Sequence, residues 1–327
     1  MFRVRSIQSL PANFPEFLEE IAEGLSALYG HRAGAHYRQN AEMSIQTAMR
    51  HPSVQCAAVF AGDRECPRPD AAAILLAVTR HSVAQFSLVH VLGRFTGLAL
   101  ENQLITHMVS TLREGGVSGI VCESLPMTDV DLDGPFRALG FGQVERLLME
   151  CPLRPDGLAR PTLKESVPLT PDDLPGLADT IVDAYRDHPG RWLHSEVRHV
   201  PNALAFLQSA LHGGYGATRA SFCRVVRRDG RVVAGLAGTE IVPGTGFVLQ
   251  VAVRRANQGR GLGTLLMKEV AQCFCESGLE RIALGVTAGN PARRLYERLG
   301  FRRLRTVNAY AWWDAAGDIV SSQARLV

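Results

Sequence analysis

The sequence lacks any long apolar run. Its longest strongly apolar stretch, residues 71–78, is far shorter than the roughly 20 residues that a membrane-spanning helix needs. Arg3 and Arg5 lie near the start, but they are not followed by an apolar segment of the kind found in secretory signal peptides. We therefore expect a cytoplasmic protein with no membrane partner.

Patterns that bind metals are scarce. The seven cysteines include no C-x-x-C pair, and the closest two, Cys273 and Cys275, form only a C-x-C. Structural zinc sites use several Cys and His ligands at fixed spacings. We therefore expect no metal, and we expect the thiols to be reduced and mostly buried.

Net charge is also small. The 35 Lys and Arg residues nearly balance 32 Asp and Glu residues. Because the net charge of +3 comes without interleaved basic and aromatic residues, we expect no nucleic-acid partner. The charge is uneven, however, since residues 1–160 carry −3 and residues 161–327 carry +6. A basic second half suits a ligand with several phosphates.

The chain has 327 residues, 46% of them hydrophobic, which is enough for about two domains with buried cores. Landmarks that recur 160 residues apart indicate two copies of one domain. We predict a first domain at residues 1–155, a proline-rich linker at 156–161 and a second domain at 162–327. The landmarks pair Pro11 with Pro171, Pro15 with Pro175, residues 89–91 with 249–251, and Gly140 with Gly300.

In the second copy, apolar periodicity alternates between the patterns of helices and strands. Asp229-Gly230 lies between two β-branched runs and predicts a hairpin. This order of elements predicts an α/β fold with a mixed sheet. The expected helices are 174–185, 202–211, 262–275 and 291–299, and the expected strands are 222–226, 232–241, 247–253, 281–286 and one or two within 301–313.

A glycine-rich loop joins the expected strand at 247–253 to the next helix. Gly259, Gly261 and Gly263 allow backbone conformations that other residues resist, and they let a ligand approach the amides. N–H groups at a helix N-terminus bind anions, so the loop suits a pyrophosphate, with Arg260 as an added cation. The spacing differs from G-x-G-x-x-G and from a P-loop, and a glycine-rich turn without ligand is the other alternative.

Two segments resemble the signatures of GNAT acyltransferases. Gln258-x-x-Gly261-x-Gly263 resembles the family's (R/Q)-x-x-G-x-(G/A) motif, and residues 292–301 resemble its A-x-x-L-Y-x-x-x-G-F motif. The resemblance covers nearly the whole second half. It implies a mostly antiparallel sheet with a splayed parallel strand pair and flanking helices. Together with the repeat it implies two tandem GNAT-like domains, an architecture similar to that of mycothiol synthase.

The resemblance implies an acyl-CoA-dependent N-acyltransferase in which a small-molecule or peptide amine attacks the thioester directly. Acetyl-CoA is the expected co-substrate. Tyr296 falls where the family places its general acid, and a phenol can protonate the departing thiolate. Glu240 is the best carboxylate for a general base, with a solvent-facing strand residue as the alternative. Coenzyme contacts are implied for Val251, Ala252, Val253, Gln258, Gly259, Arg260, Gly261, Leu262, Gly263, Thr264, Asn290 and Tyr296.

Two details of this implied site stay open. The family often has an Asn three residues before the position of Ala292, but here Gly289 stands there and Asn290 follows it. Asn290 is then a coenzyme contact, a helix cap or both. In addition, the backbone N–H that polarises the thioester carbonyl belongs to a residue near Val251 or Ala252.

The first copy keeps the motif skeleton as Arg94-x-x-Gly97-x-Ala99. Phe95 replaces the first loop glycine, and Glu101 adds negative charge near the expected phosphate. At the offset of 160, three positions change: Phe136 stands at Tyr296, Val130 at Asn290 and His90 at Gln250.

A phenylalanine cannot donate a proton, so we predict that the first copy is catalytically degenerate. His90 is either a base or a packed histidine. The alternative function for the whole chain is a CoA-binding regulatory or scaffold protein in which both copies are inactive.

Overall fold

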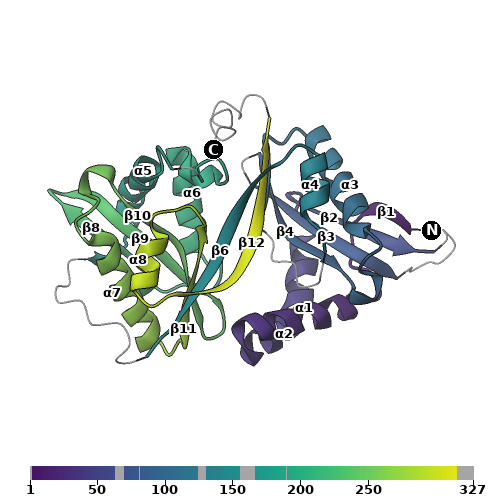
Figure 1. The fold of residues 1–327 in the computed structure, drawn as a ribbon, viewed down its shortest axis with the longest axis horizontal. Helices are drawn as coiled ribbons and strands as arrows, with labels where there is room; N and C mark the ends of the chain where they lie inside the picture. The colour runs from purple at the N-terminus through teal and green to yellow at the C-terminus, as the bar shows by residue number, and fades with distance from the viewer. Residues whose placement is uncertain are drawn as a thin grey trace. The chain divides into compact units, whose positions relative to one another are not determined.

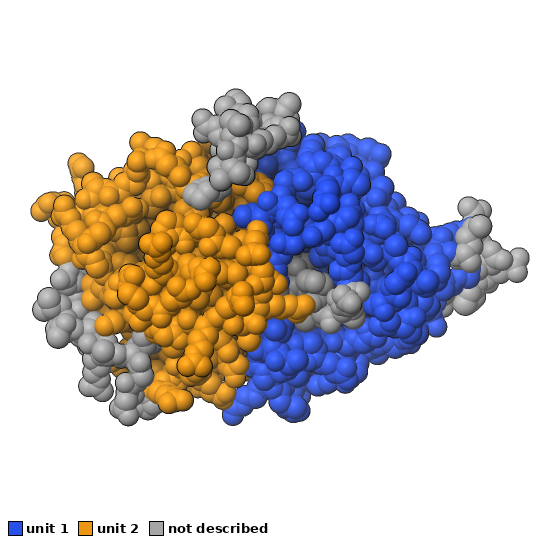
Figure 2. Space-filling model, in the orientation of Figure 1, with its two compact units in different colours: residues 1–144, 307–327 blue, residues 145–306 orange. Residues whose placement is uncertain are grey.

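The computed structural model describes residues 2–62, 70–80, 82–123, 130–154, 166–188 and 190–314. The chain divides into two compact units (Figures 1 and 2): unit 1 contains residues 1–144 and 307–327, and unit 2 contains residues 145–306. Each unit has a sheet with one parallel strand pair and flanking helices, so the predicted α/β fold is confirmed. The predicted linker at 156–161 lies outside the described residues.

In unit 1 the strands lie in the order β1-β2-β3-β4-β5-β12. Strands β4 and β5 are parallel, with Val83 opposite Gly119, and the other neighbours are antiparallel. The elements are β1 (Phe2–Ile7), α1 (Phe14–Tyr29), α2 (His31–Ala48), β2 (Val54–Ala61), β3 (Ala71–Arg80), β4 (Val83–Val91), η1 (Gly93–Phe95), α3 (Leu100–Glu114), β5 (Gly119–Cys122), α4 (Asp133–Ala138) and the end of β12 (Arg302–Trp313).

In unit 2 the order is β6-β11-β10-β9-β8-β7, and β10 and β11 are the parallel pair. The elements are β6 (Gly142–Pro152), β7 (Val167–Pro168), α5 (Leu174–Ala184), η3 (Ser195–Val197), α6 (Val200–Leu211), β8 (Cys223–Arg228), β9 (Arg231–Val242), β10 (Thr245–Val253), η5 (Arg255–Asn257), α7 (Leu262–Glu276), β11 (Arg281–Thr287) and α8 (Arg293–Arg298).

The predicted hairpin joins β8 and β9. Its two central residues, Asp229 and Gly230, both have positive φ values, 50° and 73°. A two-residue turn of this kind matches the right-handed twist of the strands that it connects. The hairpin is therefore fixed by local sequence chemistry.

Apolar side chains on both faces of each sheet pack against helices. In unit 2, Cys223 and Val225 of β8 join the cluster formed by α5 and α6, whereas Val226 joins the cluster formed by α7 and α8. This alternation follows from the pleat of a strand, which directs successive side chains to opposite faces. Unit 1 repeats the arrangement, with α1 and α2 in one cluster and α3 and α4 in the other.

The last strand of each sheet comes from the other sequence repeat. Residues 146–152 of β6 follow the first copy's α4, yet they pair antiparallel with β11 in unit 2. Residues 310–313 of β12 follow the second copy's α8, yet they pair with β5 in unit 1. The compact units therefore divide at 144/145 and 306/307, and these positions differ from the repeat boundaries that we expected at 155 and 162.

Candidate active site

The parallel strands β10 and β11 pair only over their first four residues, from Thr245 opposite Arg281 to Val248 opposite Leu284 (Figure 1). Beyond this point β10 stays paired with β9, and β11 stays paired with β6. The register of β10 on β9 also shifts between Val248 and Gln250. The two strands diverge as a result, and a pocket opens where they part.

Polar side chains from four parts of unit 2 line this pocket. They come from β6, from the segment between α5 and α6, from the divergent strands and from the start of α8. The polar lining residues are Arg146, Tyr185, His188, His194, Glu196, Gln250, Thr287, Asn290 and Tyr296.

The backbone of β10 presents alternate amides to the gap. The Arg254 N–H donates to the Val233 carbonyl on the β9 side, at 2.8 Å. Because amide directions alternate along an extended strand, the Ala252 N–H also faces β9, and the N–H groups of Val251 and Val253 face the gap. Of the two amides proposed for the thioester carbonyl, the geometry therefore favours Val251 over Ala252.

Tyr296 lies in α8, and only 6% of its surface is exposed. Burial raises the pKa of its phenol, and the neighbouring Tyr185 acts in the same direction, against an opposing effect of Arg146. The phenol therefore keeps its proton at physiological pH. Within the described part of the chain, its hydroxyl forms no hydrogen bond. The structure thus places a buried proton donor at the pocket.

One carboxylate in the pocket is held as an anion. Burial acts to raise the pKa of Glu196, but His194 and Arg146 outweigh it and hold the pKa below the usual range. Arg146 Nη1 lies 2.8 Å from His194 Nε2, and His194 Nδ1 lies 3.3 Å from Glu196 Oε1. Since a guanidinium only donates, His194 Nε2 accepts, and the proton on Nδ1 points to Glu196.

A second histidine offers a donor to the pocket. His188 Nδ1 accepts from the Gly190 N–H at 2.9 Å, which leaves the proton of a neutral ring on Nε2. That Nε2 atom is buried and has no hydrogen-bond partner among the described residues. Burial lowers the pKa of His188, with the Asn290 side chain acting in the opposite direction.

The glycine loop ends at the N-terminus of α7. Gly259 and Gly261 have φ values of 75° and 80°, and a Cβ at either position would meet no atom within 4 Å. At Gly263, a Cβ would lie 3.6 Å from Leu295 Cδ2, so an alanine fits there as well. The first helical hydrogen bond runs from Leu265 N to Gly261 O, at 3.0 Å.

It follows that the N–H groups of Leu262, Gly263 and Thr264 have no partner within the helix. They point into the open space beyond Gly259 and Gly261, where the helix dipole also favours negative charge. This arrangement can hold a phosphate group.

Side chains and neighbouring carboxylates fix the shape of the loop. Gln258 Nε2 donates to the Val253 carbonyl at 3.0 Å, and Asp183 of α5 accepts from the Arg255 N–H at 2.8 Å. Asn290 Oδ1 accepts from the Ala292 N–H at 2.8 Å. Gln258 and Asn290 therefore stabilise backbone turns at the two ends of the pocket.

Glu240 is not brought to the pocket. It lies near the end of β9, where its Oε1 accepts from the Gly244 N–H at 2.9 Å and so stabilises the turn between β9 and β10. Glu240 pairs with Gly246, whereas the pocket is lined by residues 248–251 of β10, and Glu240 is not among the lining residues. The structure therefore separates Glu240 from Tyr296, and Glu196 is the carboxylate that lies beside the tyrosines.

Six polar lining residues were missed from the sequence: Arg146, Tyr185, His188, His194, Glu196 and Thr287. Four of them lie in or beside the segment between α5 and α6, which has no regular periodicity. The pattern His194-x-Glu196 beside Tyr185 is the only local signal for them.

The first copy has the same loop, but in a register that differs from our prediction. Val83 opposite Gly119 in unit 1 corresponds to Thr245 opposite Arg281 in unit 2, an offset of 162 residues rather than 160. The predicted match of Arg94 to Gln258 is therefore wrong by two positions. The N-cap of α3 shows the shift most clearly, because Ala99 adopts a positive φ of 53° there.

With the offset of 162, Ala99 stands at Gly261, Glu101 at Gly263 and Leu88 at Gln250. We had predicted that His90 corresponds to Gln250, and that prediction is wrong. Glu101 is buried in the first turn of α3, where it places negative charge beside the helix N-terminus. The offset returns to 160 in the short helices, where Phe136 of α4 occupies the place of Tyr296 in α8.

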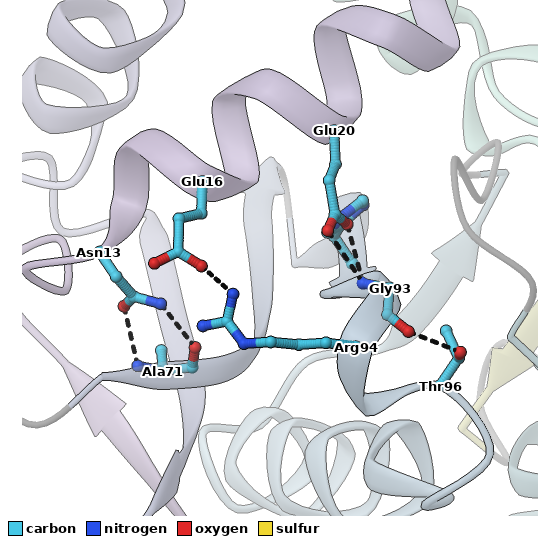
Figure 3. A network of polar contacts seen from close by, with 8 residues as sticks. Asn13, Glu16, Glu20, Ala71, Gly93, Arg94 and Thr96 are labelled. Atoms are coloured by element: carbon cyan, nitrogen blue, oxygen red, sulfur yellow. Dashed lines mark hydrogen bonds and ion pairs between the residues drawn. The ribbon is translucent and has the colours of Figure 1, made fainter.

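Carboxylates from α1 hold the loop of the first copy (Figure 3). Glu20 accepts from the Gly93 N–H at 2.9 Å and contacts His90 Nε2 at 2.9 Å. Arg94 is ion-paired with Glu16. Arg94, which we had matched to the motif, is thus engaged by α1. His90 is fully buried, and burial lowers its pKa despite the opposing effect of Glu20, as expected for a packed histidine.

Other kinds of site receive no support from the described residues. Among them no cluster of His, Cys, Asp and Glu could hold a metal ion. No helix in the described segments is long and apolar enough to cross a membrane.

Comparisons with known proteins find one family with a similar sequence segment and several structures with a similar fold. Residues 179–301 match the sequence profile of the Acetyltransferase (GNAT) family. No curated protein gives a significant match. Among solved structures, a GCN5-related N-acetyltransferase from Sphaerobacter thermophilus is 18% identical, with 95% of each chain covered and a TM-score of 0.63.

Two other structures are similar over nearly the whole of this chain. A tandem GNAT protein from the clavulanic acid biosynthesis pathway is 16% identical, with a TM-score of 0.57 over 95% of this chain and 98% of that one. A GCN5-related glucosamine N-acetyltransferase region of a fungal multi-domain GH3 β-N-acetylglucosaminidase is 16% identical, with a TM-score of 0.62, and the match spans 38% of that chain.

The structural matches extend the fold to both halves, and the profile match contains the glycine loop and Tyr296. Residues 179–301 thus match the Acetyltransferase (GNAT) family, and the whole chain shares its fold with proteins that include a tandem GNAT protein.

Proposed function

We propose that the chain is an N-acetyltransferase that moves an acetyl group from acetyl-CoA to a primary amine, with one active site, in unit 2. One observation carries the proposal: β10 leads from the pocket that the buried Tyr296 phenol lines to the glycine loop and the N-terminus of α7. The family match supports the reaction class.

The coenzyme would bind along β10. Its pyrophosphate accepts from the N–H groups of Leu262, Gly263 and Thr264, close to Arg260. Its pantetheine arm follows the unpaired edge of β10, because the Val251 and Val253 amides face the gap with no strand beside them. The thioester then lies near Val251, within the pocket that Tyr296 lines.

In the reaction, the amine lone pair adds to the thioester carbon, and the carbonyl oxygen gains negative charge beside the Val251 N–H. The amine must enter unprotonated, so the ammonium proton leaves to water before attack. The C–S bond then breaks, and Tyr296 donates its proton to the departing thiolate. The nitrogen that attacked loses its extra proton, which passes through water to the Tyr296 phenolate, so the products are a neutral amide and the CoA thiol.

Glu196 would attract the acceptor. It is the carboxylate that the pocket holds in its anionic form, and an ammonium group is drawn to it before losing its proton. Because its pKa is lowered, we assign Glu196 to binding of the amine rather than to removal of its proton. No catalytic role is proposed for Glu240.

The test is titration of acetyl-CoA by calorimetry, followed by a panel of small-molecule and peptide amines with release of CoA thiol as the readout. We expect one site per chain and turnover with at least one amine. Absence of binding would refute the proposal. Binding without turnover on any amine would instead support the inactive, CoA-binding alternative.

A further inference from the structure

The pocket contains one oxygen atom with two hydrogen-bond donors directed at it. Gln250 Oε1 accepts from the Val251 N–H at 3.1 Å and from the Tyr185 hydroxyl at 3.0 Å. A backbone N–H can only donate, so the atom facing Val251 is the carboxamide oxygen rather than its nitrogen. All three residues line the pocket at the point where β10 and β11 part.

These two donors have the geometry that a developing oxyanion needs. Donors that stabilise the oxyanion in acyl transfer lie roughly 2.7–3.1 Å from its oxygen, and both distances fall within that range. The donors come from different elements, since Val251 belongs to β10 and Tyr185 immediately follows α5. A carboxamide carbonyl is planar and trigonal like a thioester carbonyl, so one can take the place of the other.

The first copy provides an internal comparison. In the register fixed by the parallel strands, Leu88 stands at the place of Gln250, and Phe136 takes the place of Tyr296. The carboxamide is therefore absent from the copy that lacks the phenol. If Gln250 served only to accept the hydrogen bond from the unpaired Val251 N–H, the first copy would need an equivalent acceptor for the N–H of Val89.

Resting on the acetyltransferase function proposed above, we propose that the Tyr185 hydroxyl and the Val251 amide together form the oxyanion hole. Gln250 Oε1 occupies this hole when no acetyl-CoA is bound. It withdraws when the thioester carbonyl arrives, and the two donors pass from one carbonyl oxygen to the other.

The two tyrosines then have separate tasks. During attack, the carbonyl π electrons move to oxygen, which accepts hydrogen bonds from Tyr185 and Val251 but takes no proton. When the C–S bond breaks, the sulfur takes its proton from Tyr296. Burial raises the pKa of Tyr185, so the hydroxyl retains the proton that it donates to the carbonyl.

The first experiment needs no knowledge of the acceptor. Acetyl-CoA labelled with ¹³C at the carbonyl is bound to the wild type, Tyr185→Phe and Tyr296→Phe, and the carbonyl stretch is measured by isotope-edited infrared difference spectroscopy. We expect a band below that of free acetyl-CoA in the wild type and in Tyr296→Phe. In Tyr185→Phe, the band should shift back toward the free position, while the calorimetric affinity stays within about threefold because a neutral hydrogen bond contributes little net binding energy.

Turnover supplies the second readout. With an amine found in the panel, Tyr185→Phe should lower kcat by about 100-fold, as for loss of one oxyanion donor, with little change in KM. The matched control is Tyr37→Phe, which removes a tyrosine hydroxyl in α2 of unit 1 and should leave kcat unchanged. If Tyr185→Phe had both the carbonyl band position and the kcat of the wild type, the inference would be refuted.

Gln250→Leu tests the other half, because leucine is the residue that the first copy has at this position. Free CoA has no thioester carbonyl and need not displace Gln250. The variant should therefore tighten acetyl-CoA about three- to tenfold relative to CoA, the range for one net hydrogen bond. An unchanged ratio of the two affinities would overturn the role of Gln250.

These outcomes are separable from those of the proposed function. If the wild type neither binds nor uses acetyl-CoA, the acetyltransferase assignment fails. If the wild type is active and Tyr185→Phe equals it in band position and kcat, only the oxyanion assignment fails.

Discussion

Replacement of Gly261 by aspartate should abolish coenzyme binding while leaving the fold almost intact. Gly261 is the N-cap of α7, with φ at 80°, and a Cβ there meets nothing within 4 Å. The variant therefore bears only the cost of a left-handed backbone, about 1 kcal/mol, and aspartate tolerates that region better than most residues. The helix dipole offsets roughly 0.3–1 kcal/mol of this cost, because the new charge lies at the N-terminus.

The effect on binding should be much larger. The new carboxylate would stand in the open space where the pyrophosphate binds. Two like charges about 5 Å apart, at an effective dielectric constant of about 20, repel each other by about 3 kcal/mol. Because about 2.7 kcal/mol corresponds to a 100-fold change, the affinity for acetyl-CoA should fall by at least that factor. Calorimetry measures the affinity, and thermal unfolding should show a decrease in Tm of no more than about 4 °C.

The first copy supplies the matched control. Ala99 occupies the corresponding N-cap with φ at 53°, so Ala99→Asp introduces the same side chain in the same backbone conformation. We expect it to leave acetyl-CoA binding unchanged. A folded Gly261→Asp variant that binds acetyl-CoA within threefold of the wild type would show that this helix does not hold phosphate. Loss of affinity in Ala99→Asp would show that the first copy binds coenzyme.

Four further outcomes are expected. Tyr296→Phe should lower kcat by about 10²–10⁴ at unchanged acetyl-CoA affinity, and single-turnover kinetics with a saturating amine would detect it. Glu196→Gln should raise KM for the amine about tenfold and change kcat less, as steady-state kinetics would show. Proteolytic cleavage at 156–161 should leave both fragments together in size-exclusion chromatography, because each supplies a strand to the other's sheet. Because the pKa of His90 is lowered in the folded protein, the unfolded chain binds more protons at this residue below about pH 6.5. The contribution of His90 to the free energy of unfolding should be fully present above that pH and be lost as the pH falls. In His90→Gln, the denaturant midpoint should therefore decrease less as the pH falls.

The elements of the second copy were largely predictable because their signals are local. The helices expected at 174–185 and 262–275 are observed at Leu174–Ala184 and Leu262–Glu276. Amphipathic spacing suffices for such assignments together with the turn residues before each helix, Pro171 to Asp173 for the first and Gly261 for the second. The glycine loop was equally predictable from the sequence, since glycine adopts the positive φ found at Gly259 and Gly261 without strain.

The register of the first copy was mispredicted for a related reason. We assigned the N-cap with positive φ to a glycine, but in the first copy Ala99 takes that conformation. The chance pattern Arg94-x-x-Gly97-x-Ala99 then satisfied the family motif two residues too early. The pairing of Val83 with Gly119 reveals the correct offset, and it could not be read from local sequence because it joins residues 36 positions apart.

Only some of the pocket residues could be predicted from the sequence. Tyr296 belongs to a motif, whereas Tyr185, His194 and Glu196 lie in a segment with no period, and their convergence depends on where that segment folds against β10. Glu240 was chosen because it lies late in a strand of the sheet. Position along a strand does not reveal which residues line the pocket, and the structure engages the Glu240 carboxylate in the turn between β9 and β10.

The exchange of the last strands gives the first copy a structural role that does not depend on catalysis. Arg146 belongs by sequence to the first repeat, but it lies in β6 of unit 2 and contacts His194 in the pocket. A Cβ at Gly285 of β11 would lie only 2.9 Å from an Arg146 guanidinium nitrogen, so β11 has its glycine where that side chain crosses it.

Without β6, the mostly buried strand β11 would become an open edge, which invites aggregation. The first copy can therefore lack the counterparts of Gln250 and Tyr296, with Leu88 and Phe136 in their places, because neither position supports the second sheet. It cannot lack the strand that follows α4, because that strand completes both the fold of unit 2 and the wall of its pocket.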